Sequence, residues 1–382
     1  MGKNMIFHIP AVIDSKKPSG PNIRPLKMIA AFRKLGYNVH CVMGTPGQRR
    51  KKIKKIRREI REGKKYSFLY SESWDAPTLF THRSYLPSLC TDFALFSLCS
   101  NENIPVGLFY RDVYWAVKGY TEGYSRKRKL KQRILRYFYL YDIWNYNRYV
   151  DILYLPSLKM RNYIPAKITS RCENLPPGLS LKVKENTTWK RFENTPLRLV
   201  YVGGINKMYD ITLMLRAVSQ CQNVTLTICC REEDWKRYGG KYRDYMNEKV
   251  QVVHKKGDDL ESVYNNSDVA CLLQPRISPF TFAMPLKLFE YMEFDKPAIC
   301  FEGTEMARLI NGYKTGWSVS YDEQSLVSLL SKIDHNEILG KKINIKRVKY
   351  LHTWSRRAGK VADDLDFDKK LTVPNPPVFK VL

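Results

Sequence analysis

The sequence predicts an α/β protein with two doubly wound, Rossmann-like domains that face a central cleft. Its 382 residues are more than one hydrophobic core usually spans. A strand–turn–helix–strand pattern occurs near the N-terminus and again roughly 190 residues later, as two such domains require. The composition is that of a globular protein, with 44% hydrophobic residues, 20 Gly and 20 Pro.

The first pattern begins with the apolar run MIFHIPAVID, which predicts a strand. The segment SKKPSGPN has the residues of a turn, and the spacing of Leu26, Ile29 and Phe32 after it predicts a helix. Gly36 suits the end of that helix, and residues 39–42 predict the next strand.

The second pattern is the segment LRLVYVGGINKMYDITLMLRAVSQCQNVTLTICC. It predicts a strand over 197–202, a turn at Gly203-Gly204, a helix over 211–218 and a strand over 224–229. The preceding stretch is polar and lacks clear periodicity, which indicates a linker over 181–196.

The chain carries a large excess of positive charge, +28, from 65 Lys and Arg against 37 Asp and Glu. Such a charge implies an anionic partner: nucleic acid, a phosphorylated small molecule or an anionic membrane surface. Two basic runs, 49–65 and 125–150, combine Lys and Arg with apolar residues at helical spacing. Either run fits a membrane-surface helix or a solvated helix face, and the sequence leaves both open. No nucleic-acid-binding motif accompanies the charge, so no nucleic acid is expected as a partner.

The cysteines and the apolar runs bear on the compartment. Nine cysteines, an odd number without CxxC spacing, favour reduced and mostly buried thiols in a cytosolic chain, without a structural zinc site. The N-terminal apolar run is too short for a signal peptide, and no stretch approaches the ~20 apolar residues of a membrane span. We therefore expect a cytoplasmic protein, soluble or lying on a membrane surface.

Two segments of the second domain suggest a ligand site. A strand that ends in Gly203-Gly204 leaves free N–H groups that suit a phosphate, and Lys207 lies within reach of the same phosphate. The alternative is that the two glycines serve only the geometry of the turn. Downstream, a short helix and a buried strand over 269–273 are followed by the expected loop ISPFTFAM and then PLKLFEYMEFDKPAIC. In this last segment a helix is predicted from Pro285, with Lys287 and Glu290 on one face. A carboxylate there can accept two hydrogen bonds from the cis-diol of a ribose.

Four motifs in the expected order resemble those of the glycosyltransferase family 4 group, which has the GT-B fold. PLKLFEYMEFDKPAI resembles its donor-binding helix, and YVGGINKMYDITLMLRA resembles the start of its C-terminal domain. NLPPGLS resembles the loop before its linker, and LHTWSRRAGKVADDL its closing helix, which crosses back to the N-terminal domain. The resemblance implies an acceptor-binding domain over 1–180, a nucleotide-sugar-binding domain over 197–350 and a returning helix and tail over 351–382.

The family implies transfer of a sugar from a nucleotide diphosphate donor, with retention of anomeric configuration and without a metal or a separate cofactor. By this resemblance Glu290 binds the donor ribose, Lys207 neutralises the diphosphate, and Arg231 and Lys287 contact the nucleotide or phosphate. The N-terminal glycine-rich loop, here with Gly20, also lies near the donor. The main chain is expected to hold the sugar and phosphates at Phe282, Ala283, Met284, Pro285 and Leu286.

The sequence departs from the family at three places. Phe282 stands where the family often has a glutamate that contacts the donor sugar. Asp295 stands where a glycine usually precedes the KP pair, and Asp tolerates the left-handed conformation less well than Gly does. The first glycine-rich loop is reduced to residues 19–22.

A polar pair in the N-terminal half, Arg111-Asp112, ends the strand-like run before VYWAV. The family often has a polar His/Asp position there, so Asp112 is a candidate catalytic residue that orients an acceptor hydroxyl or the donor sugar. An Arg–Asp pair with a purely structural role is the alternative. His82 is a weaker candidate, because a lone His is more often structural.

These observations predict a peripheral glycosyltransferase on the inner face of the plasma membrane. The expected donor is a UDP-sugar, and the expected acceptor is a glycan or a polyprenyl-diphosphate-linked molecule. The expected setting is bacterial surface polysaccharide biosynthesis. The two basic runs are expected to contact an anionic membrane surface. The alternative is a non-catalytic protein that binds polyanions or nucleic acid on a similar scaffold.

Overall fold

The structure is a computed structural model, which describes residues 3–14, 20–80, 91–117, 125–181, 195–206, 208–274 and 278–366. The chain divides into two compact units. The N-terminal unit comprises Met1–Pro176 and Trp354–Leu382, and the C-terminal unit comprises Pro177–Thr353. Almost all of the linker expected over 181–196 lies outside the described residues, as do His82 and Lys207.

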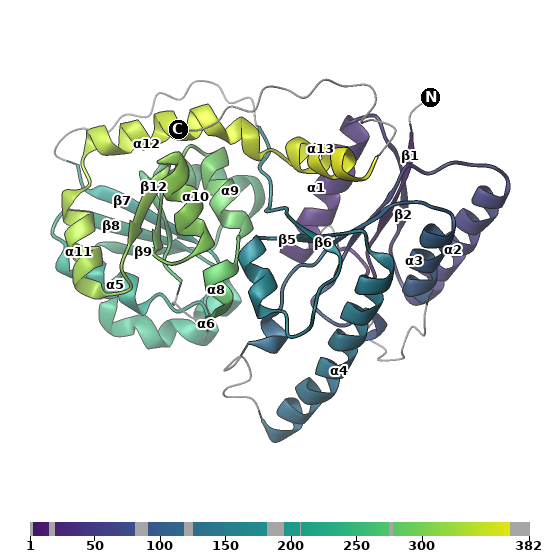
Figure 1. Ribbon diagram of the computed structural model, residues 1–382. Helices are drawn as coiled ribbons and strands as arrows, with labels where there is room; N and C mark the ends of the chain where they lie inside the picture. The colour runs from purple at the N-terminus through teal and green to yellow at the C-terminus, as the bar shows by residue number, and fades with distance from the viewer. Residues whose placement is uncertain are drawn as a thin grey trace. The chain divides into compact units, whose positions relative to one another are not determined.

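The N-terminal unit is built on a parallel sheet with the strand order β2-β1-β3-β4-β5-β6 (Figure 1). Its strands are β1 (Asn4–His8), β2 (Asn38–Val42), β3 (Leu69–Glu72), β4 (Val106–Phe109), β5 (Ile152–Leu155) and β6 (Arg171–Asn174). Its helices are α1 (Gly20–Lys34), α2 (Pro46–Arg61), α3 (Thr91–Asn101), α4 (Arg126–Tyr149) and α13 (Trp354–Leu365).

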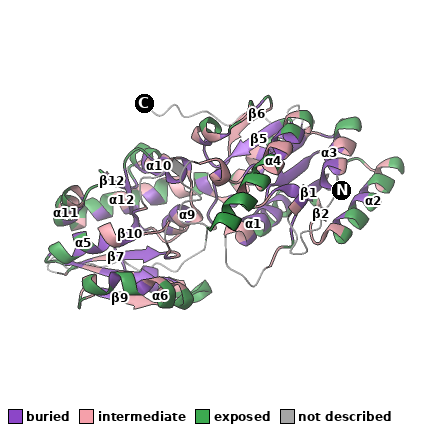
Figure 2. Ribbon diagram, turned by 90° about the horizontal axis from the view of Figure 1, so that it is seen from below, coloured by how far each residue is buried: buried purple, intermediate pink, exposed green. Residues whose placement is uncertain are grey.

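The strand order explains how the helices cover this sheet. Because β2 and β3 lie on opposite sides of β1, right-handed crossovers place α1 on one face and α2 to α4 on the other. Helix α13, which comes from the far end of the sequence, packs beside α1 (Figure 1). The central strands are therefore covered on both faces, and β3, β4 and β5 are buried throughout (Figure 2).

The C-terminal unit repeats this architecture with the parallel strand order β12-β11-β10-β7-β8-β9. Its strands are β7 (Leu197–Val202), β8 (Val224–Cys229), β9 (Val250–Val253), β10 (Val269–Leu272), β11 (Ala298–Phe301) and β12 (Gly316–Val319). Its helices are α5 (Thr212–Gln220), α6 (Glu232–Tyr238), α7 (Leu260–Asn265), α8 (Ser278–Phe282), α9 (Leu286–Glu293), α10 (Glu305–Tyr313), α11 (Glu323–Lys332) and α12 (His335–Val348). The predicted pair of doubly wound α/β folds is confirmed.

Three local predictions need correction. Gly20 does not lie in a turn, because it is the first residue of α1. The segment ISPFTFAM, expected to be a loop, contains the short helix α8. Pro285 is the N-cap of α9 rather than a residue of its first turn. All three are helix boundaries, which depend on capping and packing more than on periodicity.

Asp295 occupies the left-handed conformation in which the family usually has glycine, with φ +53°. This conformation disfavours residues with a Cβ, and aspartate is among those that adopt it with less strain. The side chain is also held from outside the turn, because Lys349 Nζ donates to Asp295 Oδ1 at 2.7 Å. The departure from glycine is therefore accommodated by a cross-link to the 3-10 turn after α12, η6 (Lys349–His352).

The other expectations for the chain concern thiols and membrane spans. The eight cysteines in the described residues are free, and six of them are buried. None of the described helices is both long enough and apolar enough to cross a bilayer.

A buried lysine at the start of β11 predicts a pH dependence of stability. Lys296 is 4% exposed, and its Nζ donates to the carbonyl of Ser267 at 2.8 Å. Burial, reinforced by the positive charge of nearby Lys342, lowers the pKa of Lys296 to about 7, although Asp268 opposes the shift. Because the unfolded chain keeps this proton up to its ordinary pKa of 10.5, the free energy of unfolding should rise between pH 7 and 9. The slope approaches about 1.4 kcal/mol per pH unit for this one group.

Urea unfolding of the whole chain at pH 6.5, 8 and 9 measures this rise. Lys296→Met, which removes the titrating group, should flatten it, leaving the smaller contribution of Lys342, whose pKa is lowered to about 8 by burial. A pH profile unchanged by Lys296→Met would contradict the assignment.

Candidate functional site

The candidate site of the C-terminal unit lies where β7, β8 and β10 end, at the carboxyl edge of the sheet. Open parallel sheets bind ligands at this edge. Gly203 follows β7 directly, and its N–H donates to the carbonyl of Cys229, the last residue of β8, at 3.0 Å. Tyr201 Oη donates to the carbonyl of Gly204 at 2.8 Å, which fixes the turn. A Cβ at Gly203 would meet Tyr201 Oη at 2.9 Å, so a larger residue there would displace the hydroxyl that fixes the turn.

Helix α9 is attached to this edge through the hydroxyl of Tyr291. The N–H of Val202, the last residue of β7, donates to Tyr291 Oη at 3.1 Å, and the carbonyls of Val202 and Cys271 lie 3.5 Å from the same oxygen. Tyr291 is completely buried, between Leu288 and Met292 on the apolar face of the helix. The helix is thereby held beside the Gly203-Gly204 turn.

Glu290 precedes Tyr291 and lies on the half-exposed face of α9. Lys287 Nζ contacts Glu290 Oε2 at 2.7 Å, as the i,i+3 spacing predicts. Tyr264, on α7, donates its hydroxyl to Glu290 Oε1 at 2.7 Å. Both carboxylate oxygens thus have one donor each, and both keep further acceptor capacity.

The segment before α9 is open to solvent in part, as a binding segment must be. Ala283, Met284, Pro285, Leu286 and Lys287 are all of intermediate exposure. The first N–H groups of a helix lack partners within the helix, so this segment presents donors and a partial positive charge. Phe282 is 1% exposed, so its side chain belongs to the core and does not replace the missing glutamate.

Arg231 follows β8 and is exposed, at the N-cap of α6. It therefore lies at the same edge as the glycine turn. The structure does not describe Lys207, so its place relative to the turn remains a prediction.

In the N-terminal unit, Asp112 lies just beyond β4 in a cluster of charged residues. Arg111 pairs with Glu72 at 3.4 Å rather than with Asp112, and Glu72 also pairs with Arg24 at 3.2 Å. Asp112 Oδ1 accepts from the N–H of Tyr114 at 3.4 Å, and no ion pair reaches it from the described part of the chain. Burial raises the pKa of Asp112 to about 6, with Arg111 opposing the shift. The alternative of a structural Arg111–Asp112 ion pair is therefore not what the structure shows, and Asp112 is a half-buried carboxylate that no cation of the described residues contacts.

A hydrogen-bonded Ser–His–Asp chain occurs in the same unit but cannot act as a nucleophilic triad. His8 bonds to Ser71 Oγ at 2.8 Å and to Asp92 Oδ1 at 3.0 Å. All three residues are at most 2% exposed, so no substrate reaches the serine. Arg49 takes both oxygens of Asp92, at 2.7 and 2.8 Å. Burial opposes ionisation of Asp92, but its hydrogen bonds to His8 and Arg49 outweigh burial and lower the pKa of its carboxyl group. Because Arg49 lies on α2, Asp92 on α3 and His8 on β1, these bonds join the two helices to the strand.

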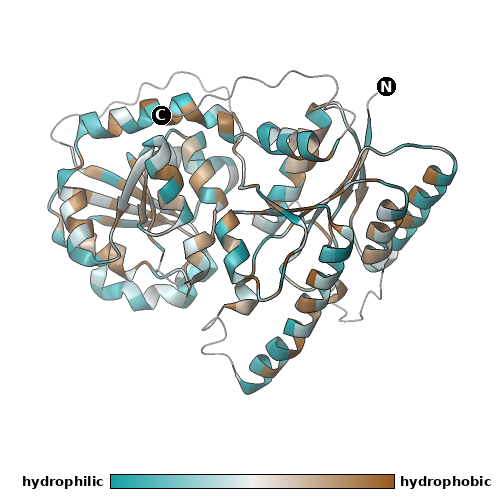
Figure 3. Ribbon diagram, viewed as in Figure 1, coloured by the Kyte–Doolittle hydropathy of each residue, from teal (hydrophilic) through white to brown (hydrophobic). Residues whose placement is uncertain are grey.

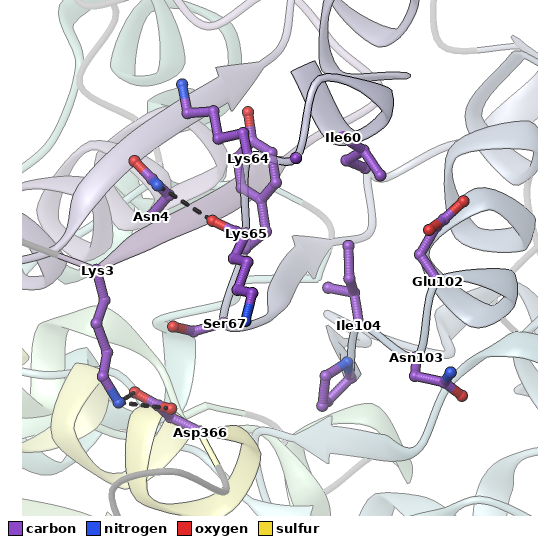
Figure 4. A pocket seen from close by; sticks show the side chains of 13 residues that line it. Lys3, Asn4, Ile60, Lys64, Lys65, Ser67, Glu102, Asn103, Ile104 and Asp366 are labelled. Atoms are coloured by element: carbon purple, nitrogen blue, oxygen red, sulfur yellow. Dashed lines mark hydrogen bonds and ion pairs between the residues drawn. The ribbon is translucent and has the colours of Figure 1, made fainter. Parts of the chain in front are cut away.

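A cavity of about 610 Å³ lies at the opposite, amino-terminal edge of the N-terminal sheet (Figure 4). It is lined by Asn4 at the start of β1 and by the residues that follow α2 and α3. Three of its charged groups have partners: Lys3 pairs with Asp366 at 3.1 Å, and Lys64 pairs with Glu59 at 3.2 Å. None of the predicted site residues lines this cavity.

Three residues at the two sheet edges were missed by the sequence analysis: Tyr264, Glu72 and Arg24. A glutamate at the end of the buried strand LYSE was the one available signal, because a buried carboxylate needs a cation. Tyr264 has the spacing of a core residue, and nothing in the sequence shows that its hydroxyl meets Glu290.

Comparison with known proteins identifies the C-terminal unit. Residues 183–349 match the sequence model of a family described as glycosyl transferases group 1. This segment belongs to that family. The predicted recognition is thereby confirmed, and the chain is a glycosyltransferase with the GT-B fold. No curated protein matches the chain.

Solved structures of similar fold cover nearly the whole chain. Sucrose-phosphate synthase from Thermosynechococcus elongatus has a TM-score of 0.63 at 14% identity, covering 97% of this chain and 99% of its own. Anabaena HepE, in complex with UDP and glucose, has a TM-score of 0.61 at 12% identity, with coverages of 95% and 99%. WaaG, a glycosyltransferase involved in lipopolysaccharide biosynthesis, has a TM-score of 0.56 at 11% identity, with coverages of 95% and 100%. At these identities the likeness extends to the fold alone.

Proposed function

We propose that this glycosyltransferase moves a sugar from a UDP-sugar to a glycan or lipid-linked acceptor in bacterial surface polysaccharide biosynthesis. The position of Glu290 is the observation that supports a nucleotide-sugar donor. Glu290 is a half-exposed carboxylate held beside the Gly203-Gly204 turn. Two adjacent features there suit a nucleoside diphosphate. The carboxylate suits the ribose hydroxyls. The N–H groups at the start of α9 suit the phosphates, whereas the Gly203 N–H is already bonded to the Cys229 carbonyl.

The choice of UDP rests on likeness and not on contacts. A structure of similar fold, Anabaena HepE, has been solved in complex with UDP-glucose. The acceptor class rests in the same way on WaaG, which is involved in lipopolysaccharide biosynthesis.

In the proposed reaction the acceptor oxygen bonds to the anomeric carbon as the bond from that carbon to the diphosphate oxygen breaks. The departing diphosphate gains negative charge, which Lys207, Lys287, the α9 N-terminus and the Gly204 N–H would stabilise. With this much positive charge from the chain, we propose that the transfer is independent of metal and needs no separate cofactor. We propose retention of configuration from the family resemblance.

Asp112 is proposed to orient the acceptor hydroxyl. Its pKa, raised to about 6, lies close to neutral pH, so this carboxylate can exchange a proton with a hydroxyl. Because Phe282 is buried, the sugar hydroxyls must be held mainly by the main chain of residues 283–286.

Helix α4 supports a peripheral place on an anionic membrane. Its outer face carries a stripe with i, i+4, i+7 and i+14 spacing, in which Leu130 is 59%, Ile134 51%, Tyr137 75% and Trp144 56% exposed. Seven exposed cations surround the N-terminal end of this stripe. The ribbon of α4 accordingly alternates between hydrophilic and hydrophobic residues along its length (Figure 3). Exposed apolar residues flanked by Lys and Arg suit an interface of acyl chains and anionic headgroups.

Helix α2 differs from α4 although its sequence looks similar. Its residues Ile53 and Ile56 are buried, so its outer face carries charge without exposed apolar groups. We therefore propose that α4 inserts side chains into the cytoplasmic leaflet of the plasma membrane and that α2 contributes electrostatic attraction only.

The donor assignment predicts selective nucleotide binding that depends on Glu290. Thermal shift and calorimetry with UDP, GDP, ADP, dTDP and CMP should show one preferred nucleoside diphosphate. Glu290→Gln should weaken it by about tenfold or more, because hydrogen bonds to a charged group are lost. Glu293→Gln, on the same helix, is the matched control, because Glu293 accepts instead from the N–H of Ser180 and should leave affinity unchanged.

The same panel separates the proposal from non-specific polyanion binding. A polyanion binder would respond to every polyphosphate, and its affinity would fall steeply with salt. That pattern, or no response to any nucleotide, would contradict the donor assignment.

The membrane assignment predicts different effects for the two helices. Replacing Leu130, Ile134 and Tyr137 with Ser should remove the part of anionic-liposome binding that survives high salt. Replacing Lys51, Lys54 and Lys55 on α2 with Gln should reduce only the salt-sensitive part. Co-sedimentation at low and high salt measures both, with nucleotide affinity as the check on folding. Equal losses from the two variants at high salt would overturn the distinction.

A further inference from the structure

We infer that Tyr264 is a positioning residue, which holds Glu290 in place for the donor ribose, and that Lys287 is a counter-ion that the donor displaces. This inference rests on the proposed function and deepens it. It assigns different roles to the two groups that contact Glu290 in the described part of the chain.

Tyr264 is a fixed hydrogen-bond donor. It is completely buried on α7, and its ring packs against Phe294 at 4.3 Å between centroids and against Tyr291 at 5.9 Å. Both neighbours lie on or directly after α9, the helix that carries Glu290. Burial and the charge of Glu290 raise the pKa of Tyr264, so its hydroxyl keeps the proton that it donates to Oε1.

Lys287 is held much less firmly. Its side chain is 28% exposed and lies one turn before Glu290 on the same helix, at the end of a flexible four-carbon stem. An exposed i,i+3 ion pair is weak and exchanges readily. A diphosphate near the α9 N-terminus carries more negative charge than one carboxylate, so it attracts the ammonium away from Oε2.

The two roles together give a directed exchange of partners. When Lys287 moves to phosphate, Oε2 becomes free for a ribose hydroxyl, while Oε1 stays bound to Tyr264. The carboxylate therefore keeps one orientation with and without ligand. Without the Tyr264 hydroxyl it would lose that anchor when its counter-ion left.

Binding of the preferred nucleoside diphosphate and of its 2′-deoxy and 3′-deoxy analogues tests this inference. In the wild type, removal of a ribose hydroxyl that Glu290 binds should weaken affinity roughly tenfold. Tyr264→Phe should weaken binding of the parent nucleotide by a similar factor. It should leave binding of the deoxy analogue that lacks the Glu290-bound hydroxyl almost unaffected, so the ratio of the two affinities falls toward one. Lys287→Met should weaken all three ligands about equally, because the phosphates are common to them.

Tyr242→Phe is the matched control, because Tyr242 is equally buried in the same unit and its hydroxyl bonds to Asp210 at 3.3 Å instead. It should keep the wild-type ratio. A wild-type ratio in Tyr264→Phe would overturn the inference while leaving the donor assignment intact. A ratio that Glu290→Gln does not change would overturn the donor assignment itself.

Discussion

The site depends on one buried hydroxyl, that of Tyr291, which joins α9 to the ends of β7 and β10. The Val202 N–H donates to it at 3.1 Å, at the last residue before the Gly203-Gly204 turn. A helix packed on a sheet can slide along it unless a directional contact fixes its register, and a buried hydrogen bond supplies such a contact. Glu290 precedes Tyr291, so the same bond sets the position of the carboxylate relative to the turn.

The two units differ in the kind of polar and charged groups that they carry. The C-terminal unit gathers small, directional groups at its sheet edge: the Gly203-Gly204 turn, a helix N-terminus and one carboxylate with two donors. The N-terminal unit carries the charge of α2 and α4, and its sheet edge holds the Arg24–Glu72–Arg111 cluster. In the proposed function, donor recognition rests on the groups of the C-terminal unit, while attraction to an anionic surface rests on α2 and α4 of the N-terminal unit.

Strands were predicted well because their burial leaves a clear pattern in the sequence. Residues 197–202 and 224–229 form the predicted strands at the predicted bounds: the first is an almost wholly buried apolar run, and the second begins with alternating buried and half-buried residues. Helical spacing alone also placed Lys287 and Glu290 on one face of a helix, where the structure pairs them. Such features depend on residues close together in the chain.

Features that depend on helix capping, or on residues far apart in the chain, were missed. Helix α8 and the helical place of Gly20 are set by local capping and packing that short sequence windows do not reveal. A structural Arg111–Asp112 pair was one of two alternatives, but Arg111 pairs with Glu72, which comes from the neighbouring strand β3. The Tyr264–Glu290 bond joins residues 26 positions apart on different helices, so neither spacing nor composition predicts it.

Hydrogen–deuterium exchange of the whole chain with and without UDP tests the central claim most directly. Bound UDP should protect amides at two places in the C-terminal unit, the Gly203-Gly204 turn and α9, and should leave α2 and α4 unchanged. Protection spread over the basic helices, or confined to the N-terminal unit, would contradict a donor site built on Glu290.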